Sequence, residues 1–459
     1  MKKTLITLSL LSAFSALAVK REKPGLLPSP QKIDWNKKAI TLKSVEIKNQ
    51  IKSKSTKLSF AFKTLKKILQ RNKLKVSKKG FYKITLKLGE VKAPYQKEEA
   101  YQLSVKRNGI TLTANTDKGI FYGIQTINQL VYRKKKKTTV ALCEITDYPA
   151  FKIRGFMHDV GRNFQSMKQL KQHIDVMALY KYNVFHWHLT DHFGWRLESK
   201  LFPDLQSAKS FGRYHGKYYT QEEFKEMVQY CRIRNIMVIP EFDGPGHSEA
   251  FRHGLGFKNM KDKRVIPTMT KLIDELCTLA PKEVMPYIHV GTDEVRHRDE
   301  YVNGDYLPAI HAAVRKNDRR VIGWWKGMHV KGDKKQIQQT WAQYNPLKGN
   351  PQIDSKSNYV NHLFLLDAPI RFLFQQPCRV PHGDQNSLGG ILAYWPDIRV
   401  SSEEVGLKIS PVYIAKVAYS ESVWKGVEKN RHEYWSIMPP KGTPEYEAYV
   451  DFESRLVEQ

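Results

Sequence analysis

The feature that most constrains the fold is an alternation, from about residue 149 onward, of short apolar segments with amphipathic helical segments. This alternation is typical of βα repeats, in which helices join parallel strands. Ser166 and Gln169, and again Thr220 and Glu223, have the spacing of capping boxes that open two of the helices. Eight such repeats predict a (β/α)8 TIM barrel over residues 149–440. The expected strands are at residues 153–160, 184–189, 236–240, 287–291, 320–324, 336–341, 358–361 and 389–395.

Residues 19–148 are expected to form a separate, small α/β domain. The segments 101–105, 109–113 and 140–145 have the pattern of strands, and 117–131 has that of a helix packed on a sheet. The segment contains no cluster of catalytic residue types, so we expect it to be structural. Residues 441–459 form a C-terminal tail of unassigned role.

The first 18 residues have the pattern of a bacterial export signal. Lys2 and Lys3 precede an apolar stretch, and Ala16–Ala18 resembles a cleavage site. No cysteine follows this site to carry a lipid, and no later apolar run is long enough for a membrane helix. We therefore expect an exported protein, either periplasmic or secreted.

The cysteines are widely separated and match no metal-binding spacing. Cys231 and Cys277 fall in step with apolar neighbours, so both are expected to face the core from helices. Export would permit disulfides, but this pattern does not require them. The four cysteines are Cys143, Cys231, Cys277 and Cys378.

The net charge of +31 favours polyanionic partners such as sulfated or sialylated glycans, acidic cell surfaces or nucleic acid. The alternative is that the charge serves solubility. Because the lysines are spread widely and no nucleic-acid-binding signature is present, we favour solubility and expect no nucleic-acid partner. The dense run 133–137 is explained by a solvated loop between two elements.

TIM barrels carry their chemistry at the carboxyl ends of the strands. The adjacent carboxylates Asp293 and Glu294 follow the fourth expected strand, where mutual repulsion would raise the pKa of the one in the less polar position. A solvated acidic pair is the alternative. Three tryptophans at strand ends suggest an aromatic wall suited to sugar faces, although any one of them could simply fill the barrel rim. The polar and aromatic residues at strand ends are Asp191, His247, Asp293, Glu294, Trp324, Trp341, Tyr359 and Trp395.

A metal site is a competing interpretation of the second expected strand. His186 and His188 share one face of this strand, and together with Asp191 and His192 they could hold a divalent ion. The His-x-His pattern is similar to that of metal-dependent barrel hydrolases, but those have it in the first strand. Besides His247, no later strand end supplies further ligands, so we expect no metal and no cofactor.

Four motifs, in this order, resemble those of glycoside hydrolase family 20, the β-N-acetylhexosaminidases: Arg154–Arg162, Asn183–Asp191, Glu241–His247 and His289–Glu294. Their spacing and strand-end positions also agree with this family. Residues 27–31 and 119–131 resemble the opening and the helix of the family's companion domain. The resemblance covers nearly all of the chain beyond the signal.

The resemblance implies a mechanism without a protein nucleophile, in which the 2-acetamido oxygen of the substrate attacks the anomeric carbon. Glu294 would protonate the leaving oxygen and then activate water. Asp293 would accept the acetamide N–H and offset the charge of the oxazolinium intermediate. Tyr359 would hold the acetamide oxygen, and His247 would orient neighbouring catalytic groups.

The remaining substrate contacts follow from the same resemblance. Trp324, Trp341 and Trp395 would enclose the acetamide methyl and the sugar face. The residues expected to bind ring hydroxyls are Arg162, Asp191 and Asp397.

The sequence departs from the family at several positions. His158 stands where an apolar residue is usual, His192 and Lys326 stand where acids are usual, and Asp397 replaces a longer Glu. These departures bear on substrate preference, because none touches Asp293 or Glu294.

The sequence thus predicts a retaining exo-β-N-acetylhexosaminidase that acts on terminal β-linked N-acetylglucosamine or N-acetylgalactosamine of glycans. One alternative is a family member specialised for 6-sulfated N-acetylglucosamine, suggested by the net charge, Lys326 and His192. Another is a non-catalytic glycan-binding relative.

Overall fold

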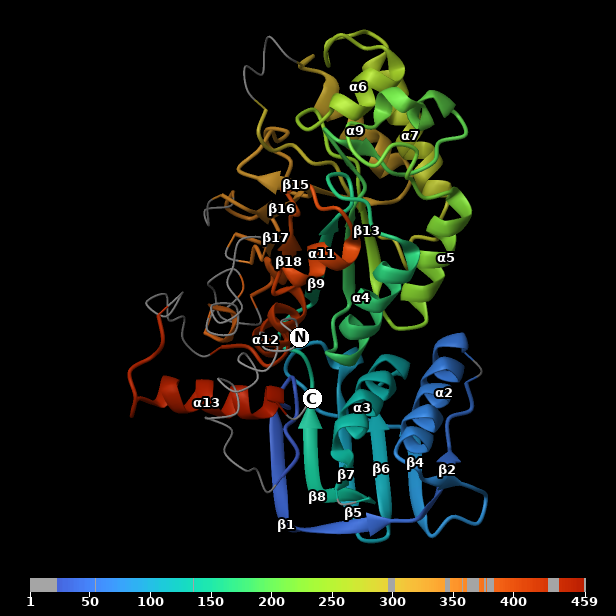
Figure 1. Cartoon of the computed structure of the whole chain (residues 1–459), viewed down its shortest axis with the longest axis vertical. Coiled ribbons are helices and arrows are strands. Elements are labelled where there is room, and N and C mark those ends of the chain that lie inside the picture. Colours follow the sequence, from blue (N-terminus) through green and yellow to red (C-terminus); the bar gives the residue numbers. More distant parts are fainter. Residues whose placement is uncertain are drawn as a thin grey trace, which may run out of the picture. The chain divides into compact units, whose positions relative to one another are not determined.

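The computed structural model describes residues 23–53, 55–134, 136–295, 302–342, 347–356, 358–360, 371–374, 377, 384–427 and 437–457. The chain forms two compact units (Figure 1). The sheet unit comprises Met1–Ala150, Pro369–Gln375 and Val417–Gln459, and the barrel unit comprises Phe151–Ala368 and Gln376–Lys416. The expected export signal and Cys378 lie outside the described residues.

The sheet unit is built on an eight-stranded sheet in the order β1-β8-β5-β6-β4-β2-β3, with β7 paired to β8. The three strands and the helix expected here are confirmed as β5, β6, β8 and α3. The strands are β1 (Lys32–Leu42), β2 (Ser44–Asn49), β3 (Lys75–Val76), β4 (Tyr82–Leu88), β5 (Tyr101–Lys106), β6 (Gly109–Ala114), β7 (Val131–Lys134) and β8 (Lys137–Asp147). The α-helices described wholly within this unit are α2 (Thr56–Arg71), α3 (Asp117–Leu130) and α13 (Pro444–Val457).

Helices α2 and α3 cover one face of this sheet (Figure 1). Glycines let α3 approach the strands closely: a Cβ at Gly123 would lie 2.3 Å from the Leu112 side chain, and one at Gly119 would lie 2.5 Å from the Ala100 carbonyl oxygen. Any larger residue at these positions would push the helix away from the sheet. Close packing of α3 therefore depends on the two glycines.

The C-terminal helix α13 is fastened to the rest of the sheet unit by Arg455. The buried guanidinium of this residue donates to the Leu26 carbonyl at 3.0 Å and pairs with Glu421 at 3.0 Å. A buried cation held by both a carboxylate and a backbone carbonyl is a satisfied one. The tail, which sequence reasoning left unassigned, thus contributes to the packing of this unit.

The barrel unit contains a closed barrel of eight parallel strands in the order β10-β13-β14-β15-β16-β17-β18-β9, which confirms the TIM-barrel prediction. The barrel strands are β9 (Ile153–Asp159), β10 (Val184–His188), β13 (Met237–Glu241), β14 (Tyr287–His289), β15 (Arg320–Trp325), β16 (Ile337–Thr340), β17 (Gln352–Asp354) and β18 (Ser387–Tyr394). A small hairpin is formed by β11 (Thr190–Asp191) and β12 (Gly194–Trp195). The α-helices formed by the described residues of this part of the chain are α4 (Met167–Leu179), α5 (Gln221–Arg232), α6 (Glu249–Leu255), α7 (Val265–Thr278), α9 (Tyr306–Lys316), α11 (Glu403–Lys408) and α12 (Val412–Trp424, which runs on into the sheet unit).

The seventh barrel strand was wrongly predicted at residues 358–361. It is β17, Gln352–Asp354, and Tyr359 forms only an isolated bridge to Ala393. A strand of three residues is too short to show an alternation of apolar and polar residues. The segment 358–361, which follows it, was therefore predicted to be the strand. Asn361 lies outside the described residues.

Both helix starts expected from capping boxes are present. At α5 the box is complete, because Thr220 accepts from the Glu223 N–H and the Glu223 side chain accepts from the Thr220 N–H. At α4 only the Ser166 half forms, since the Gln169 side chain donates to Tyr413 instead. Cys231 and Cys277 are buried on α5 and α7 as predicted.

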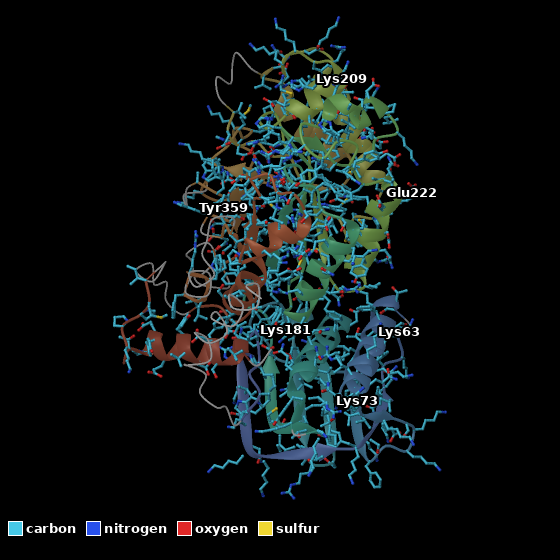
Figure 2. All side chains as sticks on the ribbon, in the orientation of Figure 1. Lys63, Lys73, Lys181, Lys209, Glu222 and Tyr359 are labelled. Atoms are coloured by element: carbon cyan, nitrogen blue, oxygen red, sulfur yellow. The ribbon has the colours of Figure 1, made fainter. Side chains whose placement is uncertain are left out.

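Charged side chains are spread over both units, with Lys63 and Lys73 on the sheet unit and Lys209 and Glu222 on the barrel unit (Figure 2). Among the described residues, no helix is both long enough and apolar enough to cross a bilayer.

Candidate active site

The carboxyl ends of the barrel strands bring together most of the site residues expected from the sequence. Parallel strands in a closed barrel all point the same way, so residues that follow them meet at one rim. Asp191 and His247 follow β10 and β13, and Asp293 and Glu294 follow β14. Trp324 is the last residue but one of β15, and the residues after β16, β17 and β18 include Trp341, Tyr359, Trp395 and Asp397.

His247 links three of the carboxylates. Its Nδ1 lies 3.4 Å from Asp191 Oδ2, and its Nε2 lies 3.3 Å from Glu294 Oε2 and 3.8 Å from Asp293 Oδ2. Burial alone would lower the pKa of His247, but Asp243 and the carboxylates around it raise that pKa to about 12. The imidazole is therefore cationic at neutral pH, and it holds the acidic groups of three strand ends in one network.

Asp293 and Glu294 occupy different environments despite being adjacent. Asp293 is buried, and burial raises its pKa, which the cationic His247 partly opposes. Its Oδ1 makes no hydrogen bond among the described residues. The Glu294 side chain is 57% exposed. One carboxyl is thus enclosed with an unused acceptor oxygen, while its neighbour faces solvent.

The backbone before and at this pair is strained. Gly291, Thr292 and Glu294 have φ angles of 70°, 94° and 47°, in the left-handed region. A Cβ at Gly291 would lie 1.8 Å from Asp243 Oδ1, so only glycine fits there. Positive φ at Thr and Glu is costly, and such strain is concentrated at functional sites. The turn aims Asp293 inward and Glu294 outward.

Arg162 is held by acidic groups and by one tryptophan. Its guanidinium lies 2.7 Å from Asp159, 3.1 Å from Asp191 and 3.7 Å from Asp397, and 4.9 Å from the Trp395 ring centroid. The Asp191 carboxylate is fully buried, whereas the Asp397 side chain is 45% exposed. Asp191 is therefore placed to hold Arg162 and His247 in position, and Asp397 keeps access to solvent.

The predicted aromatic residues pack together at the same rim. The rings of Trp324 and Trp395 are 5.6 Å apart, and those of Tyr359 and Trp395 are 5.9 Å apart. Trp341 and Tyr359 are half-buried and pack on the apolar core of the barrel. Tyr359 is held at the rim by its neighbours, since Val360 N–H donates to the Ala393 carbonyl and Ala393 N–H donates to the Asn358 carbonyl.

Glu241, at the end of β13, was part of a recognised motif but received no role from sequence reasoning. Its Oε2 lies 2.8 Å from His186 Nε2 and 2.6 Å from His188 Nδ1. Its Oε1 accepts from Trp324 Nε1 at 2.7 Å and lies 3.0 Å from His289 Nδ1. Burial would raise the pKa of Glu241, but the three histidines outweigh it and hold that pKa well below the usual range. An ionised carboxylate thus joins four barrel strands.

His188 carries the network from Glu241 to Asp191. Burial opposes its protonation, but Glu241 and Asp159 raise the pKa of His188 well above its usual value. Its second nitrogen, Nε2, lies 3.3 Å from Asp191 Oδ2. The alternation of His186 and His188 along β10 predicts that both face the same side of the strand, but it does not identify Glu241 as their common partner.

The alternative metal site is not assembled as a set of four. His186 and His188 are within hydrogen-bond distance of Glu241, while His192 is 37% exposed and lies 3.9 Å from Glu249. Ligand-type atoms do lie within 4.8 Å of one another in several groups, among them His186, Glu241 and His289, and Asp159, His188 and Asp191. The second group contains two of the four predicted ligands, His188 and Asp191, without His186 or His192.

His158, one of the departures from the family pattern, lies away from this network, whereas Lys326 directly follows β15 at its carboxyl end. His158 alternates with the inward-facing Met157 and Asp159, so it faces outward against His173 and Tyr394. Lys326 is exposed. His192 does lie at the site, because its ring is 4.8 Å from that of His247.

A closed parallel barrel whose carboxylates, imidazoles and indoles gather at one rim defines the class of (β/α)8 barrels that carry a catalytic centre at their strand ends. Two models of one family match the chain: Glycosyl hydrolase family 20, domain 2, over residues 23–148, and Glycosyl hydrolase family 20, catalytic domain, over residues 151–261. The chain belongs to glycosyl hydrolase family 20.

The chain is similar to a beta-hexosaminidase of Porphyromonas gingivalis, with 33% identity over 279 residues. This match covers 50% of the chain and 36% of the relative, so the chain spans about a third of that protein's length.

Solved structures share the fold. A chitobiase of Flavobacterium johnsoniae superposes with a TM-score of 0.76 at 23% identity, covering 96% of this chain and 73% of that one. An exo beta-N-acetylglucosaminidase from Vibrio harveyi, in complex with N-acetylglucosamine, gives 0.72 at 22% identity, covering 96% and 77%.

Proposed function

We propose that this chain is a retaining exo-β-N-acetylhexosaminidase that removes terminal β-linked N-acetylglucosamine or N-acetylgalactosamine from glycans. The observation that carries the proposal is the pair formed by a buried Asp293 and an exposed Glu294, both within 4 Å of His247, at the strand ends that also carry the paired rings of Trp324 and Trp395. Membership of the family and the similarity to beta-hexosaminidases support it.

In the proposed mechanism, Glu294 donates its proton to the glycosidic oxygen while the substrate's acetamide oxygen attacks the anomeric carbon. The bond to the leaving group breaks and an oxazolinium ion forms. The unused Oδ1 of Asp293 is available to accept the acetamide N–H and to offset the positive charge. Glu294, now ionised, takes a proton from the water that reopens the ring, so the anomeric configuration is retained.

The surrounding residues hold this geometry. His247 and Asp191 orient the two carboxylates, and Tyr359 holds the acetamide oxygen. Trp324, Trp341 and Trp395 enclose the acetamide methyl and the sugar face, as aromatic rings suit apolar C–H surfaces. The residues proposed to bind ring hydroxyls are Arg162 and Asp397, with Asp191 supporting Arg162.

The first test is the release of nitrophenol from a nitrophenyl N-acetyl-β-glucosaminide. Glu294→Gln cannot donate a proton, and we expect kcat to fall by about 10²–10⁴-fold. No release by the wild-type chain would favour the non-catalytic glycan-binding alternative. Loss of activity on treatment with a chelator would instead favour a metal-dependent hydrolase.

The second test separates substrate assistance from a protein nucleophile. Asp293→Asn removes the charge that faces the oxazolinium ion, and we expect a loss of about 10²–10³-fold in kcat. Nitrophenyl β-glucoside, which lacks the acetamide, should be a very poor substrate. Full activity of Asp293→Asn, or equal turnover of the two glycosides, would contradict the mechanism.

Specialisation for 6-sulfated N-acetylglucosamine is a second candidate, favoured by the exposed Lys326 and by His192 beside His247. It predicts faster turnover of a 6-sulfated aryl N-acetylglucosaminide than of the unsulfated one. Equal or slower turnover would exclude it. Export to the periplasm or medium is likewise proposed from residues 1–18, and fractionation of expressing cells tests it.

A further inference from the structure

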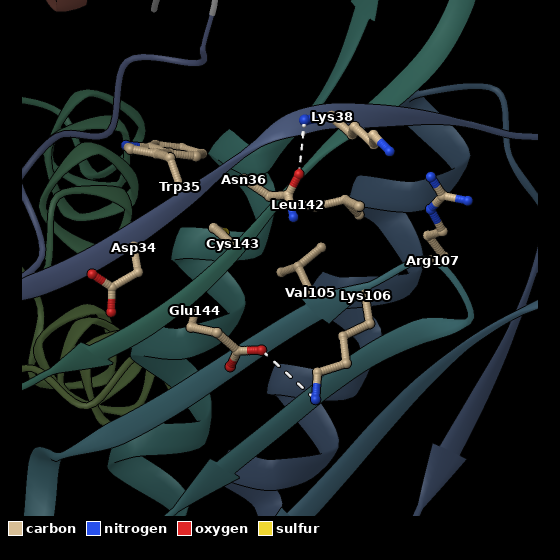
Figure 3. Close-up of a pocket in the computed structure, with 10 residues that line it drawn as sticks. All are labelled: Asp34, Trp35, Asn36, Lys38, Val105, Lys106, Arg107, Leu142, Cys143 and Glu144. Carbon is tan, nitrogen blue, oxygen red and sulfur yellow. Dashed lines mark hydrogen bonds and ion pairs between the residues drawn. The ribbon is translucent and has the colours of Figure 1, made fainter.

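The sheet unit contains a hollow of about 560 Å³ that the proposed function does not use (Figure 3). Its walls come from β1, β5 and β8 and from the turn after β5. A hollow of this volume is within the range of ligand-binding cavities. The lining residues are Asp34, Trp35, Asn36, Lys38, Val105, Lys106, Arg107, Leu142, Cys143 and Glu144.

The hollow lies at an irregularity in the pairing of β1 with β8. The register passes from Trp35 opposite Cys143 to Ala39 opposite Ala141, so β1 has extra residues between these two pairs. Such a bulge bends the strand and re-aims its side chains. The bulge is fastened by Lys38 N–H, which donates to Asn36 Oδ1 at 3.0 Å. The side chains of Trp35 and Lys38 are therefore placed by defined backbone geometry.

The lining is apolar in the middle and cationic at one end. Val105, Leu142 and Cys143 lie between Trp35 on one side and Lys38 and Arg107 on the other (Figure 3). The Trp35 ring is only half-buried. The Trp35 indole can stack on a ring of a ligand, and the two cations beyond the apolar residues can pair with an anionic substituent on that ring.

The acidic residues of the hollow already have basic partners. Asp34 lies 3.7 Å from Lys32, and Glu144 lies 3.9 Å from Lys106 and accepts from Ser104 at 2.7 Å. Within the described part of the chain, Lys38 and Arg107 form no salt bridge with an acid. Lys23 adds a further cation, with its Nζ 5.6 Å from the Trp35 ring centroid. The hollow thus offers unpaired positive charge.

We propose that this hollow binds a sulfated glycan chain, independently of the barrel site. The apolar face of one sugar would stack on Trp35, and its sulfate groups would pair with Lys38 and Arg107. Stacking distinguishes a sugar from a flexible acidic peptide, and sulfate distinguishes it from a neutral glycan. Anchoring the enzyme to such a chain would raise the local concentration of glycan ends.

The test uses the full chain carrying Glu294→Gln, so that turnover at the barrel cannot consume the probe. Binding of a heparin hexasaccharide is measured by calorimetry at low salt, with cellohexaose, a neutral glycan without the acetamide that the barrel site is proposed to bind, and an octa-aspartate peptide as comparison probes. We expect the heparin hexasaccharide to bind at least about tenfold more tightly than either. Equal binding of the peptide would show a general charge effect, and equal binding of cellohexaose would show that sulfate is not recognised; each overturns the proposal.

Matched variants locate the binding. Lys38→Glu with Arg107→Glu should weaken heparin binding by at least about tenfold, and Trp35→Ala should weaken it by a similar factor. Lys37→Glu with Lys87→Glu makes the same charge change at exposed positions outside the hollow and should weaken binding by less than about threefold. Thermal melting checks that each variant is folded. Equal losses in both double variants would overturn the proposal, whatever the activity of the barrel.

Discussion

Replacing Glu241 by Gln is predicted to destabilise the barrel by several kcal/mol, although the side chain keeps its volume. In the wild-type chain one oxygen faces His186 Nε2 and His188 Nδ1, and the other accepts from Trp324 Nε1. An amide has only one acceptor oxygen, and its NH2 group can accept from nothing. Whichever way the amide is oriented, at least one buried donor is left facing another donor.

The magnitude follows from these bonds. In the better orientation the amide oxygen faces the two histidines, so the Trp324 N–H loses its acceptor and the histidine bonds lose their charge. Hydrogen bonds to charged groups are worth about 1.5–3 kcal/mol each. The loss of one such bond and the weakening of two others should lower the free energy of unfolding by about 3–5 kcal/mol. This is also the range for removing one partner of a buried ion pair.

Asp243→Asn is the matched control, two residues away. Burial, with Asp293 nearby, raises the pKa of Asp243 well above its usual value, although His247 opposes this rise, and Asp243 Oδ1 makes no hydrogen bond among the described residues. The amide of equal size therefore replaces a carboxyl whose ionised form is disfavoured by burial, and the cost should stay below about 1.5 kcal/mol. Urea unfolding at pH 7, followed by tryptophan fluorescence, measures both variants. A loss for Asp243→Asn as large as that for Glu241→Gln would refute the assignment of charge.

Two further predictions concern a buried basic cluster formed by His158 of β9, His173 of α4 and Lys416 of α12. His173 Nδ1 is hydrogen-bonded to Lys416 Nζ. Burial, with Lys416 beside it, lowers the pKa of His158 from 6.5 to about 3. Between these two pH values the unfolded chain binds a proton that the folded chain does not, so the free energy of unfolding falls by about 1.4 kcal/mol for each unit by which the pH is lowered. His158→Leu should remove this contribution to the slope in acid unfolding curves, and an unchanged slope would contradict the prediction. Burial lowers the pKa of Lys416 well below 10.5, so the folded amine loses its proton at a lower pH than the unfolded one. Lys416→Met should therefore stabilise the chain by about 1–4 kcal/mol at pH 7, with the gain shrinking as pH approaches 10.5; a gain independent of pH would show that packing alone is responsible.

Sequence patterns located the fold well because most strands carry their own apolar signal. Residues 184–189 and 389–395, for example, were expected as strands and form β10 and β18. The three residues of β17 have only one strongly apolar member, Ile353, and carry no such signal. Tyr359, which was placed in that wrong strand, lies beyond the end of β17 and is joined to β18 by its bridge to Ala393.

The candidate site was predictable as a set of residues but not as a network. Strand-end position identified Asp293, Glu294 and His247 without any knowledge of their distances. The burial of Asp191 and the central place of Glu241 depend on neighbours across the barrel, far away in the sequence. Partners that only the closed barrel brings together leave no local pattern to read.

The pairing of the first barrel strand, β9, with the last, β18, has a consequence for the order of folding. Gly389 lies opposite Ile153, and a Cβ at Gly389 would fall 2.1 Å from the Ile153 carbonyl oxygen, so the seam accepts only glycine there. Contacts between distant parts of a chain form slowly, and chains grow from the N-terminus on the ribosome. During synthesis β9 must therefore wait with one edge unpaired until β18 emerges, and the nascent barrel is open to misassembly for nearly the whole time of its translation.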